Sequence, residues 1–289
     1  MQSENFKKII IGTAQFGMNY GVSTTTGIPN QTELKNIINY CLENNINYLD
    51  TAANYGNSEI ILGKTGVKDF KIITKIQVNK NCNFQSLLSS LKESCEKLKV
   101  EKLEGLLLHS YISSKNDSHF FSFLEEIKNT KLVNKIGVSI YNAEDMIKIY
   151  KNFAVDIFQI PLNILNRGTF QDDVLNDVRS SGAEIHIRSI FLQGLLLMDK
   201  NVRPSYFKKW EKLFHEWDIW LEEQGLSSLE ACLSFALYSK NVDKVLIGID
   251  SLKQLKEIIK KFKTLKKIKL PKTFITQDSN LVNPANWKF

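Results

Sequence analysis

Four ionisable side chains of four different types follow consecutive predicted strands of this 289-residue chain. Asp50 ends one short apolar run, Tyr55 lies in the loop after it, and Lys75 and His109 end the next two runs. The carboxyl ends of parallel strands in a barrel meet at one rim, so we expect the four side chains to converge there. The sequence therefore predicts one site that combines a carboxylate, a phenol, an ammonium group and an imidazole.

The acid–base properties of these groups indicate a reaction. A phenol has a pKa near 10 and is a poor proton donor at neutral pH, but an ammonium group such as Lys75 would lower that pKa. Asp50 would keep Lys75 charged and oriented, and His109 would donate a hydrogen bond to a carbonyl oxygen. The set predicts a metal-free carbonyl reduction in which Tyr55 donates the proton and a nicotinamide cofactor supplies the hydride.

Each residue also has a purely structural interpretation. An aspartate at a strand end is often a helix cap, a loop tyrosine often packs, and a histidine after LLL could be a buried core residue. Neither a G-x-S-x-G nor an H-E-x-x-H motif accompanies the set, so a serine hydrolase and a zinc protease are not indicated. The joint placement of the four residues at one rim favours the catalytic interpretation.

Eight short apolar or β-branched runs alternate with longer segments of helical periodicity. The predicted strands span residues 8–12, 46–50, 71–75, 104–109, 135–139, 156–160, 184–188 and 244–248. Helical periodicity covers residues 32–45, 84–99 and 143–153, and Thr32 and Ser251 are predicted helix N-caps. The pattern predicts a single-domain (β/α)8 TIM barrel with its strands and helices over about residues 8–263. The alternative, a doubly wound sheet, lacks the G-x-G-x-x-G signature.

The gap before the eighth strand is the longest and holds a predicted helical insertion at about residues 195–225. One stripe of an amphipathic helix in this region is formed by Phe207, Trp210, Phe214, Trp217 and Leu221. We expect the stripe to pack on the barrel, and a partner-binding or membrane-surface helix is the alternative. The C-terminal tail, residues 264–289, could close over the site or pack elsewhere.

The composition excludes several classes of protein. No apolar stretch reaches 18 residues and no signal peptide is evident, so we expect a cytoplasmic protein without membrane contact. Residues 256–269 hold seven lysines and one glutamate, and most of the net charge of +7 lies there. A solvated helix face, or attraction for an anionic cofactor, explains this stretch without nucleic acid. The spacing of the cysteines, Cys41, Cys82, Cys95 and Cys232, predicts reduced structural thiols and no metal site.

The segments 11–17, 49–63, 73–75, 106–110, 136–142, 158–167, 187–196 and 246–257 carry a resemblance to the aldo-keto reductase family. Among them the D-x-x-x-x-Y-G motif at residues 50–56, with the later lysine and histidine, is the most specific. The resemblance implies a (β/α)8 barrel and an NAD(P)H-dependent reductase with Asp50, Tyr55, Lys75 and His109 as its catalytic tetrad. Within the family, the chain also resembles a bacterial subgroup linked to surface-sugar metabolism.

The same resemblance implies a set of residues that bind NADP(H) or NAD(H). From the nicotinamide end to the adenosine end they are Gly12, Thr13, Asp50, Ser139, Gln159, Arg188, Ser189, Leu192, Gly194, Gly248, Asp250, Ser251, Gln254 and Glu257. Ile140 stands where the family usually has an asparagine, and Arg188 where many members stack a tyrosine on the nicotinamide. The charge of Arg188 would disfavour the oxidised cofactor or engage an acidic substrate group.

The adenosine segment bears on cofactor preference. NADPH-dependent members usually place Lys and Arg there, whereas this chain has Asp250 and Gln254, with Lys253 as the nearby cation. An acid at this place favours a ribose hydroxyl over a 2′-phosphate, so NADH or dual use is expected.

A small carbonyl compound, in particular a sugar or nucleotide sugar, is the expected substrate of a monomer or small homo-oligomer. The alternative function is a cofactor-binding sensor or regulatory subunit with little turnover. The loops 19–29 and 111–118 and the insertion after the seventh strand are expected to set the substrate.

Overall fold

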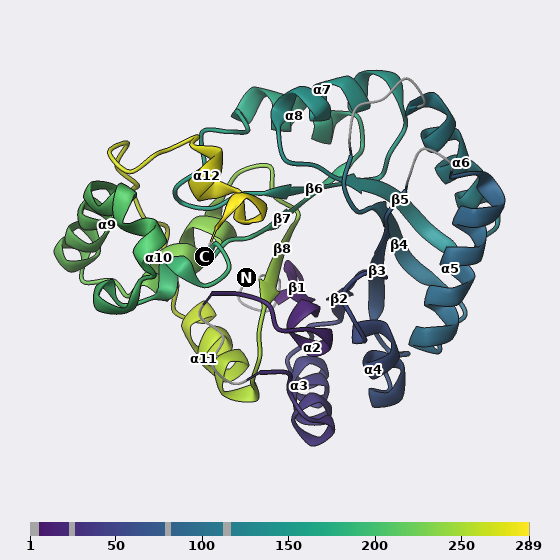
Figure 1. Ribbon diagram of the computed structural model, residues 1–289, viewed down its shortest axis with the longest axis horizontal. Coiled ribbons are helices and arrows are strands. Elements are labelled where there is room, and N and C mark those ends of the chain that lie inside the picture. Colours follow the sequence, from purple (N-terminus) through teal and green to yellow (C-terminus); the bar gives the residue numbers. More distant parts are fainter. Residues whose placement is uncertain (1–5, 23–26, 79–81, 112–116, 289) are drawn as a thin grey trace.

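A closed barrel of eight parallel strands forms the centre of the molecule (Figure 1). The computed structural model describes residues 6–22, 27–78, 82–111 and 117–288. The strands pair in chain order, and β8 pairs with β1. They are β1 (Ile9–Gly12), β2 (Tyr48–Asp50), β3 (Lys71–Ile76), β4 (Leu103–Leu108), β5 (Val133–Ser139), β6 (Ile157–Pro161), β7 (Glu184–Arg188) and β8 (Lys244–Gly248). The predicted single-domain (β/α)8 barrel is confirmed, and each predicted strand overlaps an observed one.

The parallel register places the carboxyl ends of the strands at the same level. Gly12 pairs with Asp50 of β2 and with Gly248 of β8. Ser139 pairs with Gln159, and Pro161 pairs with Arg188. Residues from far-apart parts of the chain therefore share one rim, as the strand pattern predicts.

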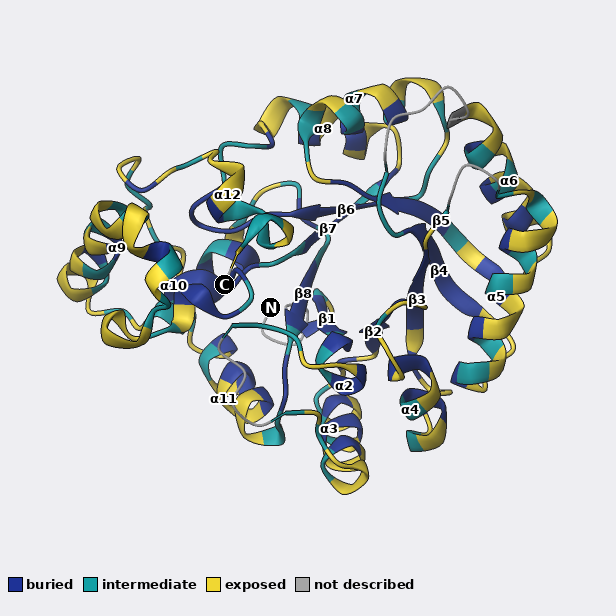
Figure 2. Cartoon of the chain, in the orientation of Figure 1, coloured by how far each residue is buried: buried dark blue, intermediate teal, exposed yellow. Residues whose placement is uncertain are grey.

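Helices surround the barrel and turn their apolar sides toward the strands. Figure 2 shows buried residues on the inner sides of the helices and exposed residues on the outer sides. The surrounding helices are α3 (Gln31–Glu43), α4 (Ser58–Thr65), α5 (Phe84–Leu98), α6 (Asp117–Asn129), α7 (Ala143–Asn152), α8 (Asp172–Ser180), α10 (Ser228–Tyr238) and α11 (Leu252–Phe262). A short helix, α2 (Ala14–Gly17), follows β1 directly.

One of the two predicted helix caps is wrong. The side chain of Asn30, not Thr32, accepts a hydrogen bond from the Glu33 backbone N–H at 2.9 Å, and Thr32 lies inside α3. Asparagine caps as well as threonine does, so the helix begins earlier than predicted. Ser251 caps α11 by accepting from the Gln254 N–H, as predicted.

The helical insertion after β7 is confirmed, but its apolar stripe does not lie on one helix. Three short 3-10 helices, η1 (Leu195–Leu197), η2 (Lys200–Val202) and η3 (Ser205–Trp210), precede α9 (Glu211–Gln224). The geometry changes from 3-10 to α at Trp210, which divides the stripe. Phe207, Phe214 and Trp217 are buried, so the stripe packs within the chain, as expected.

The C-terminal segment provides much of that packing. Phe274 lies 5.5 Å, between ring centroids, from both Trp217 and Trp220, and Trp287 packs edge-on to Phe207 at 4.9 Å. The indole N–H of Trp210 donates to Asp278 at 2.9 Å. The segment then forms α12 (Ser279–Val282) and η4 (Pro284–Asn286), which lies beside the barrel mouth. The tail therefore packs on the insertion and also reaches the site.

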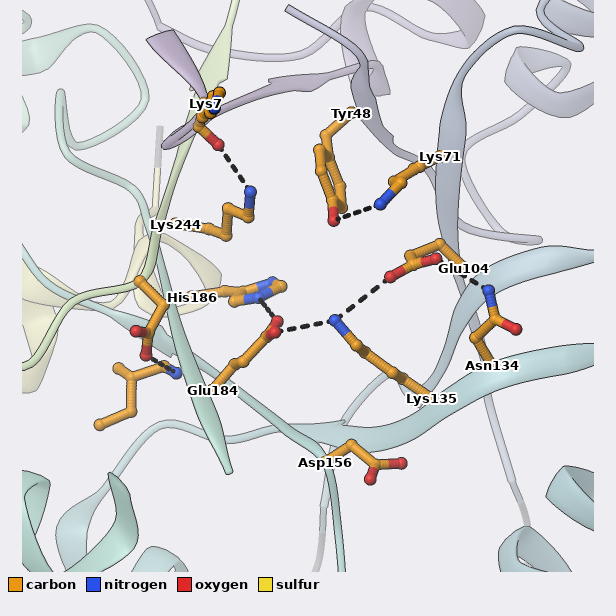
Figure 3. A network of polar contacts seen from close by, with 12 residues as sticks. Lys7, Tyr48, Lys71, Glu104, Asn134, Lys135, Asp156, Glu184, His186 and Lys244 are labelled. Atoms are coloured by element: carbon orange, nitrogen blue, oxygen red, sulfur yellow. Dashed lines mark hydrogen bonds and ion pairs between the residues drawn. The ribbon is translucent and has the colours of Figure 1, made fainter. Parts of the chain in front are cut away.

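A network of charged side chains fills the opposite end of the barrel, at the amino ends of the strands (Figure 3). Lys135 forms ion pairs with Glu104 at 3.2 Å and with Glu184 at 2.8 Å. The buried imidazole of His186 lies 3.0 Å from Glu184, and its hydrogen bond, with help from Lys135, lowers the pKa of Glu184 to about 2. These contacts link β4, β5 and β7 at this end of the barrel.

The lysine-rich stretch lies at and beyond α11. Its lysines are exposed except for Lys261, which is half-buried and pairs with Glu230 of α10 at 2.9 Å. The expected solvated face is confirmed. Among the described residues, no helix is both long and apolar enough to cross a membrane. The four cysteines are unpaired; Cys41 and Cys232 are buried, and burial raises the pKa of the Cys41 thiol to about 12.

The contact between α4 and α5 tests how tightly the helical layer is packed. A Cβ on Gly63 would lie 2.0 Å from the backbone oxygen of Lys97, which cannot move aside. Alanine favours a helix over glycine, yet we expect Gly63→Ala to lower the free energy of unfolding by about 2–3 kcal/mol. Urea denaturation followed by circular dichroism measures the change.

Gly168→Ala is the matched control, because its new methyl would meet only Ile275 at 3.4 Å. A change below about 0.5 kcal/mol is expected there. Equal stabilities of the two variants would contradict the close-packing account of Gly63.

Candidate active site

A cavity of about 830 Å³ opens at the carboxyl ends of the strands. Asp50, Tyr55, Lys75 and His109 all line it, so the structure brings the four predicted catalytic residues together. They come from the ends of β2, β3 and β4 and from the loop after β2. His109 lies one residue beyond β4 and donates its backbone N–H to Ile76 of β3 at 2.9 Å. That bond fixes the start of the loop that carries the imidazole.

A buried ion pair joins β2 to β3 at the floor of the cavity. Lys75 and Asp50 are 0% and 1% exposed, and the Lys75 ammonium donates to Asp50 Oδ1 and, at 2.9 Å, to the Thr51 carbonyl. Burial lowers the pKa of Lys75, and Asp50 opposes that shift. The second carboxylate oxygen of Asp50 accepts from Gln159 Nε2 at 2.8 Å, so both oxygens are hydrogen bonded.

Hydroxyl groups fix the strand ends behind this ion pair. The Ser58 hydroxyl, at the start of α4, lies 2.9 Å from both the carbonyl oxygen and the hydroxyl of Thr13. Thr51 donates to Ser58 at 3.1 Å, and Thr13 donates to the Asp50 carbonyl at 3.0 Å. All of these groups are buried, so β1, β2 and α4 are held in one arrangement.

The loop that carries Tyr55 is held against α2 by two glycines. Gly56 has a φ of +54°, and a Cβ there would lie 2.3 Å from the Gly17 carbonyl oxygen. A Cβ on Gly17 would lie 2.1 Å from the Tyr55 carbonyl oxygen. Side chains at either position would push the loop away, so the glycines set the depth of Tyr55 in the cavity.

The phenol ring of Tyr55 lies between His109 and Lys75. It packs edge-on to the imidazole, with 5.5 Å between centroids and an interplanar angle of 84°, and the Lys75 Nζ lies 5.1 Å from its centroid. Burial raises the pKa of Tyr55, the charge of Asp50 adds to the rise, and Arg188 is the cation that opposes it. The expectation that Lys75 lowers this pKa is wrong, because Asp50 already neutralises the ammonium charge. Tyr55 is a fully protonated phenol at neutral pH.

His109 is a neutral imidazole. Burial, with smaller effects of the Lys75 and Arg188 charges, lowers its pKa to about 4. Its Nδ1 is buried without a hydrogen-bond partner among the described residues. A neutral ring carries one N–H donor and one acceptor, so His109 can donate to a ligand oxygen in the cavity.

The predicted nicotinamide residues also meet in this cavity. Gly12, Thr13, Ser139 and Gln159 line it, and Gln159 Oε1 is a buried acceptor without a partner among the described residues. The amide N–H groups of a carboxamide would satisfy that acceptor. Ile140 is buried and apolar, and it supplies no side-chain hydrogen bond there.

Arg188, at the end of β7, presents a planar cation to the cavity. Its guanidinium carbon lies 4.4 Å from the centroid of the Tyr141 ring, and one N–H donates to the Ser189 hydroxyl at 3.4 Å. Ser189 has a φ of +60°, and Gly194 a φ of +91°, where the chain turns away from the strand. Both residues line the cavity, whereas Leu192 is buried behind it.

The far end of the cavity is formed by the residues after β8. Gly248, Asp250, Gln254 and Glu257 line it, as predicted, and Asp250 Oδ1 is a buried acceptor without a described partner. Ser251 does not line the cavity, because its hydroxyl caps α11.

Several lining residues were not predicted. They include Gln15, Tyr20, Tyr141, Gln193, Lys261 and the pairs Ser227–Ser228 and Pro284–Ala285. Gln15, Tyr141 and Gln193 lie inside the segments that carry the family resemblance, so the sequence held a usable signal for them. The start of α10 and the tail carried none, because only tertiary packing brings them to the mouth. Of the predicted substrate loops, residues 23–26 and 112–116 lie outside the described residues.

Comparison with solved structures gives the same fold. The aldo-keto reductase AKR11C1 from Bacillus halodurans, in its holo form, superposes with a TM-score of 0.74 at 17% identity, covering 94% of each chain. The thermostable aldo-keto reductase Tm1743, in complex with the inhibitor epalrestat, superposes with a TM-score of 0.68 at 18% identity, covering 92% of this chain and 91% of that one. No match is found among curated proteins.

The sequence profile of the Aldo/keto reductase family matches residues 8–273, which include every strand of the barrel and the helices around it. The chain therefore belongs to the aldo/keto reductase family and is an oxidoreductase that acts on carbonyl groups.

Proposed function

We propose that the protein reduces an aldehyde, ketone or sugar carbonyl with a nicotinamide cofactor, with Tyr55 as the proton donor. The observation that carries this proposal is the convergence of Tyr55, His109 and the Lys75–Asp50 ion pair in one cavity. A protonated phenol beside a neutral imidazole is the arrangement that a carbonyl oxygen needs when it gains negative charge.

Tyr55 delivers the proton to the carbonyl oxygen. Its raised pKa keeps the phenol protonated, and proton transfer becomes favourable as the oxygen acquires alkoxide character. The guanidinium of Arg188 stabilises the phenolate that remains, since it is the cation that opposes the rise in the pKa of Tyr55. Lys75 is a positioning residue, since its bonds to Asp50 and Thr51 fix it beneath the ring.

His109 polarises the same oxygen. A neutral imidazole N–H donates a hydrogen bond without adding a second full charge beside Arg188. The product is an alcohol, whose new C–H bond comes from the hydride and whose O–H proton comes from Tyr55.

The residues of the cavity suit a nicotinamide dinucleotide. The bound cofactor supplies the hydride to the carbonyl carbon. Ser139 and the unpaired Gln159 Oε1 would hold the carboxamide, Gly12 and Thr13 the adjoining ribose, and Ser189 and Gly194 the pyrophosphate. Gly248, Gln254 and Glu257 would border the adenosine half.

We propose NADH as the preferred cofactor. The unpaired Asp250 Oδ1 is an acceptor that suits a ribose hydroxyl and repels a 2′-phosphate. Lys261, the lysine that lines this end, is already paired with Glu230.

Tyr55→Phe tests the proton donor. Removing the hydroxyl while keeping the ring should lower kcat/KM for carbonyl reduction about 10²- to 10⁴-fold, because the carbonyl oxygen loses its proposed proton donor. Cofactor binding, measured by quenching of tryptophan fluorescence, should persist. Tyr150→Phe, on α7 outside the cavity, is the control. Full activity of Tyr55→Phe would contradict the mechanism, and cofactor binding without turnover by the unmodified protein on any carbonyl would favour the sensor alternative.

The pH dependence tests the neutral state of His109. With its pKa at about 4, protonation begins only well below pH 6, so kcat/KM should stay flat between pH 6 and 8. A step near pH 6.5 that disappears in His109→Gln would show instead that the imidazole titrates at its ordinary value.

The lowered pKa of His109 also predicts how protein stability changes with pH. The pKa of His109 is lower in the folded than in the unfolded chain, so stability is full above about pH 6.5 and falls as the pH drops toward 4. His109→Gln should flatten that part of the stability curve, as measured by thermal unfolding.

Asp250→Asn tests the cofactor preference. The unmodified protein should have a lower KM for NADH than for NADPH. The substitution should reduce the ratio of KM for NADPH to KM for NADH about 10-fold, because NADH loses a charged hydrogen bond and NADPH loses a repulsion. Asp69→Asn, which makes the same change at an exposed residue, is the control. A preference of the unmodified protein for NADPH would overturn the assignment.

A further inference from the structure

One cation at the catalytic end of the cavity has no counter-ion in the part of the chain that the structure describes. Asp50 and Lys75 neutralise each other, and Tyr55 and His109 carry no charge at neutral pH. Arg188 contacts the face of Tyr141 and the Ser189 hydroxyl, and no carboxylate among the described residues forms an ion pair with it. The catalytic end therefore holds one unneutralised positive charge.

The guanidinium of Arg188 is held by two contacts, one with Tyr141 and one with Ser189. Its guanidinium carbon lies 4.4 Å from the centroid of the Tyr141 ring, a cation–π contact that uses none of its N–H donors. Of the five N–H groups, one donates to Ser189 at 3.4 Å, and no described acceptor is assigned to the others. A half-buried cation loses some of its hydrogen bonds to water, and a bound anion would replace them.

The charge of Arg188 reaches the reacting groups. It opposes the rise that burial causes in the pKa values of Tyr20 and Tyr55, and it adds to the fall that burial causes in the pKa of His109. The guanidinium therefore lies within electrostatic range of all three side chains. An anionic group bound to Arg188 and a carbonyl group beside Tyr55 could therefore belong to one small molecule.

The single positive charge of Arg188 favours an anion with one negative charge. A single planar guanidinium matches a carboxylate in both charge and geometry through two parallel hydrogen bonds. A phosphate dianion would need a second cation, and Lys75 is committed to Asp50.

We propose that Arg188 is a specificity-determining residue that selects carbonyl substrates bearing a carboxylate, such as oxo acids or sugar acids. This inference rests on the proposed reductase function. It assigns the part of the substrate that does not react, whereas the residues around Tyr55 act on the carbonyl.

Two matched substrate pairs test it at saturating cofactor. Succinic semialdehyde is compared with butanal, and glucuronate with glucose, by the ratio of kcat/KM within each pair. Arg188→Met should reduce the acid-to-neutral ratio about 10- to 100-fold, since a charged hydrogen bond is lost. Comparing ratios between variants cancels the intrinsic reactivity of each aldehyde and any change in cofactor binding.

Two variants serve as controls. Arg188→Lys keeps the charge without the planar fork and should retain part of the ratio. Arg179→Met, at an exposed arginine of α8 outside the cavity, should not change it. An unchanged ratio in Arg188→Met, or equal efficiency on acids and neutral compounds in the unmodified protein, would overturn the inference while leaving the reductase function intact.

Failure of the proposed function has a separate signature, which is no turnover on either member of any pair. In that case calorimetric titration with succinate decides the inference by itself. Binding that Arg188→Met abolishes supports a carboxylate site, and no binding, or equal binding by both proteins, overturns it.

Discussion

The buried ion pair between Asp50 and Lys75 is the interaction on which the site depends. Two charges removed from water cost more than their attraction returns unless their remaining hydrogen-bonding atoms are satisfied. Here Gln159 donates to the second Asp50 oxygen, and the Thr51 carbonyl accepts from Lys75. The pair therefore ties β2, β3 and β6 together across the barrel, and it requires that the strand register stay fixed.

The ion pair also decides the electrostatics around it. Because Asp50 neutralises Lys75, the ammonium does not depress the pKa of Tyr55, and burial keeps the phenol protonated. The remaining positive charge is that of Arg188, on the neighbouring side of the cavity. Acid–base chemistry and recognition of charge are thereby assigned to different residues of one rim.

The two ends of the barrel carry different arrangements of polar groups. At the amino ends of the strands, Lys135 joins Glu104 and Glu184 through ion pairs (Figure 3), and the Nδ1 of His186 there is a buried atom without a described partner. At the carboxyl ends, Gln159 Oε1 and Asp250 Oδ1 are buried acceptors without described partners, and both line the cavity. The ion pairs at one end link neighbouring strands, whereas the acceptors at the other end border a cavity.

The sequence by itself determined the barrel, its strands and the convergence of Asp50, Tyr55, Lys75 and His109, because apolar periodicity fixes elements and parallel strands share one rim. It could not determine that Asp50 neutralises Lys75, that Arg188 has no counter-ion among the described residues, or that Pro284 of the tail reaches the mouth. Those properties depend on distances and burial between segments far apart in the chain. Only the tertiary structure decided them, since electrostatic and packing energies depend on separation in space and not on order in sequence.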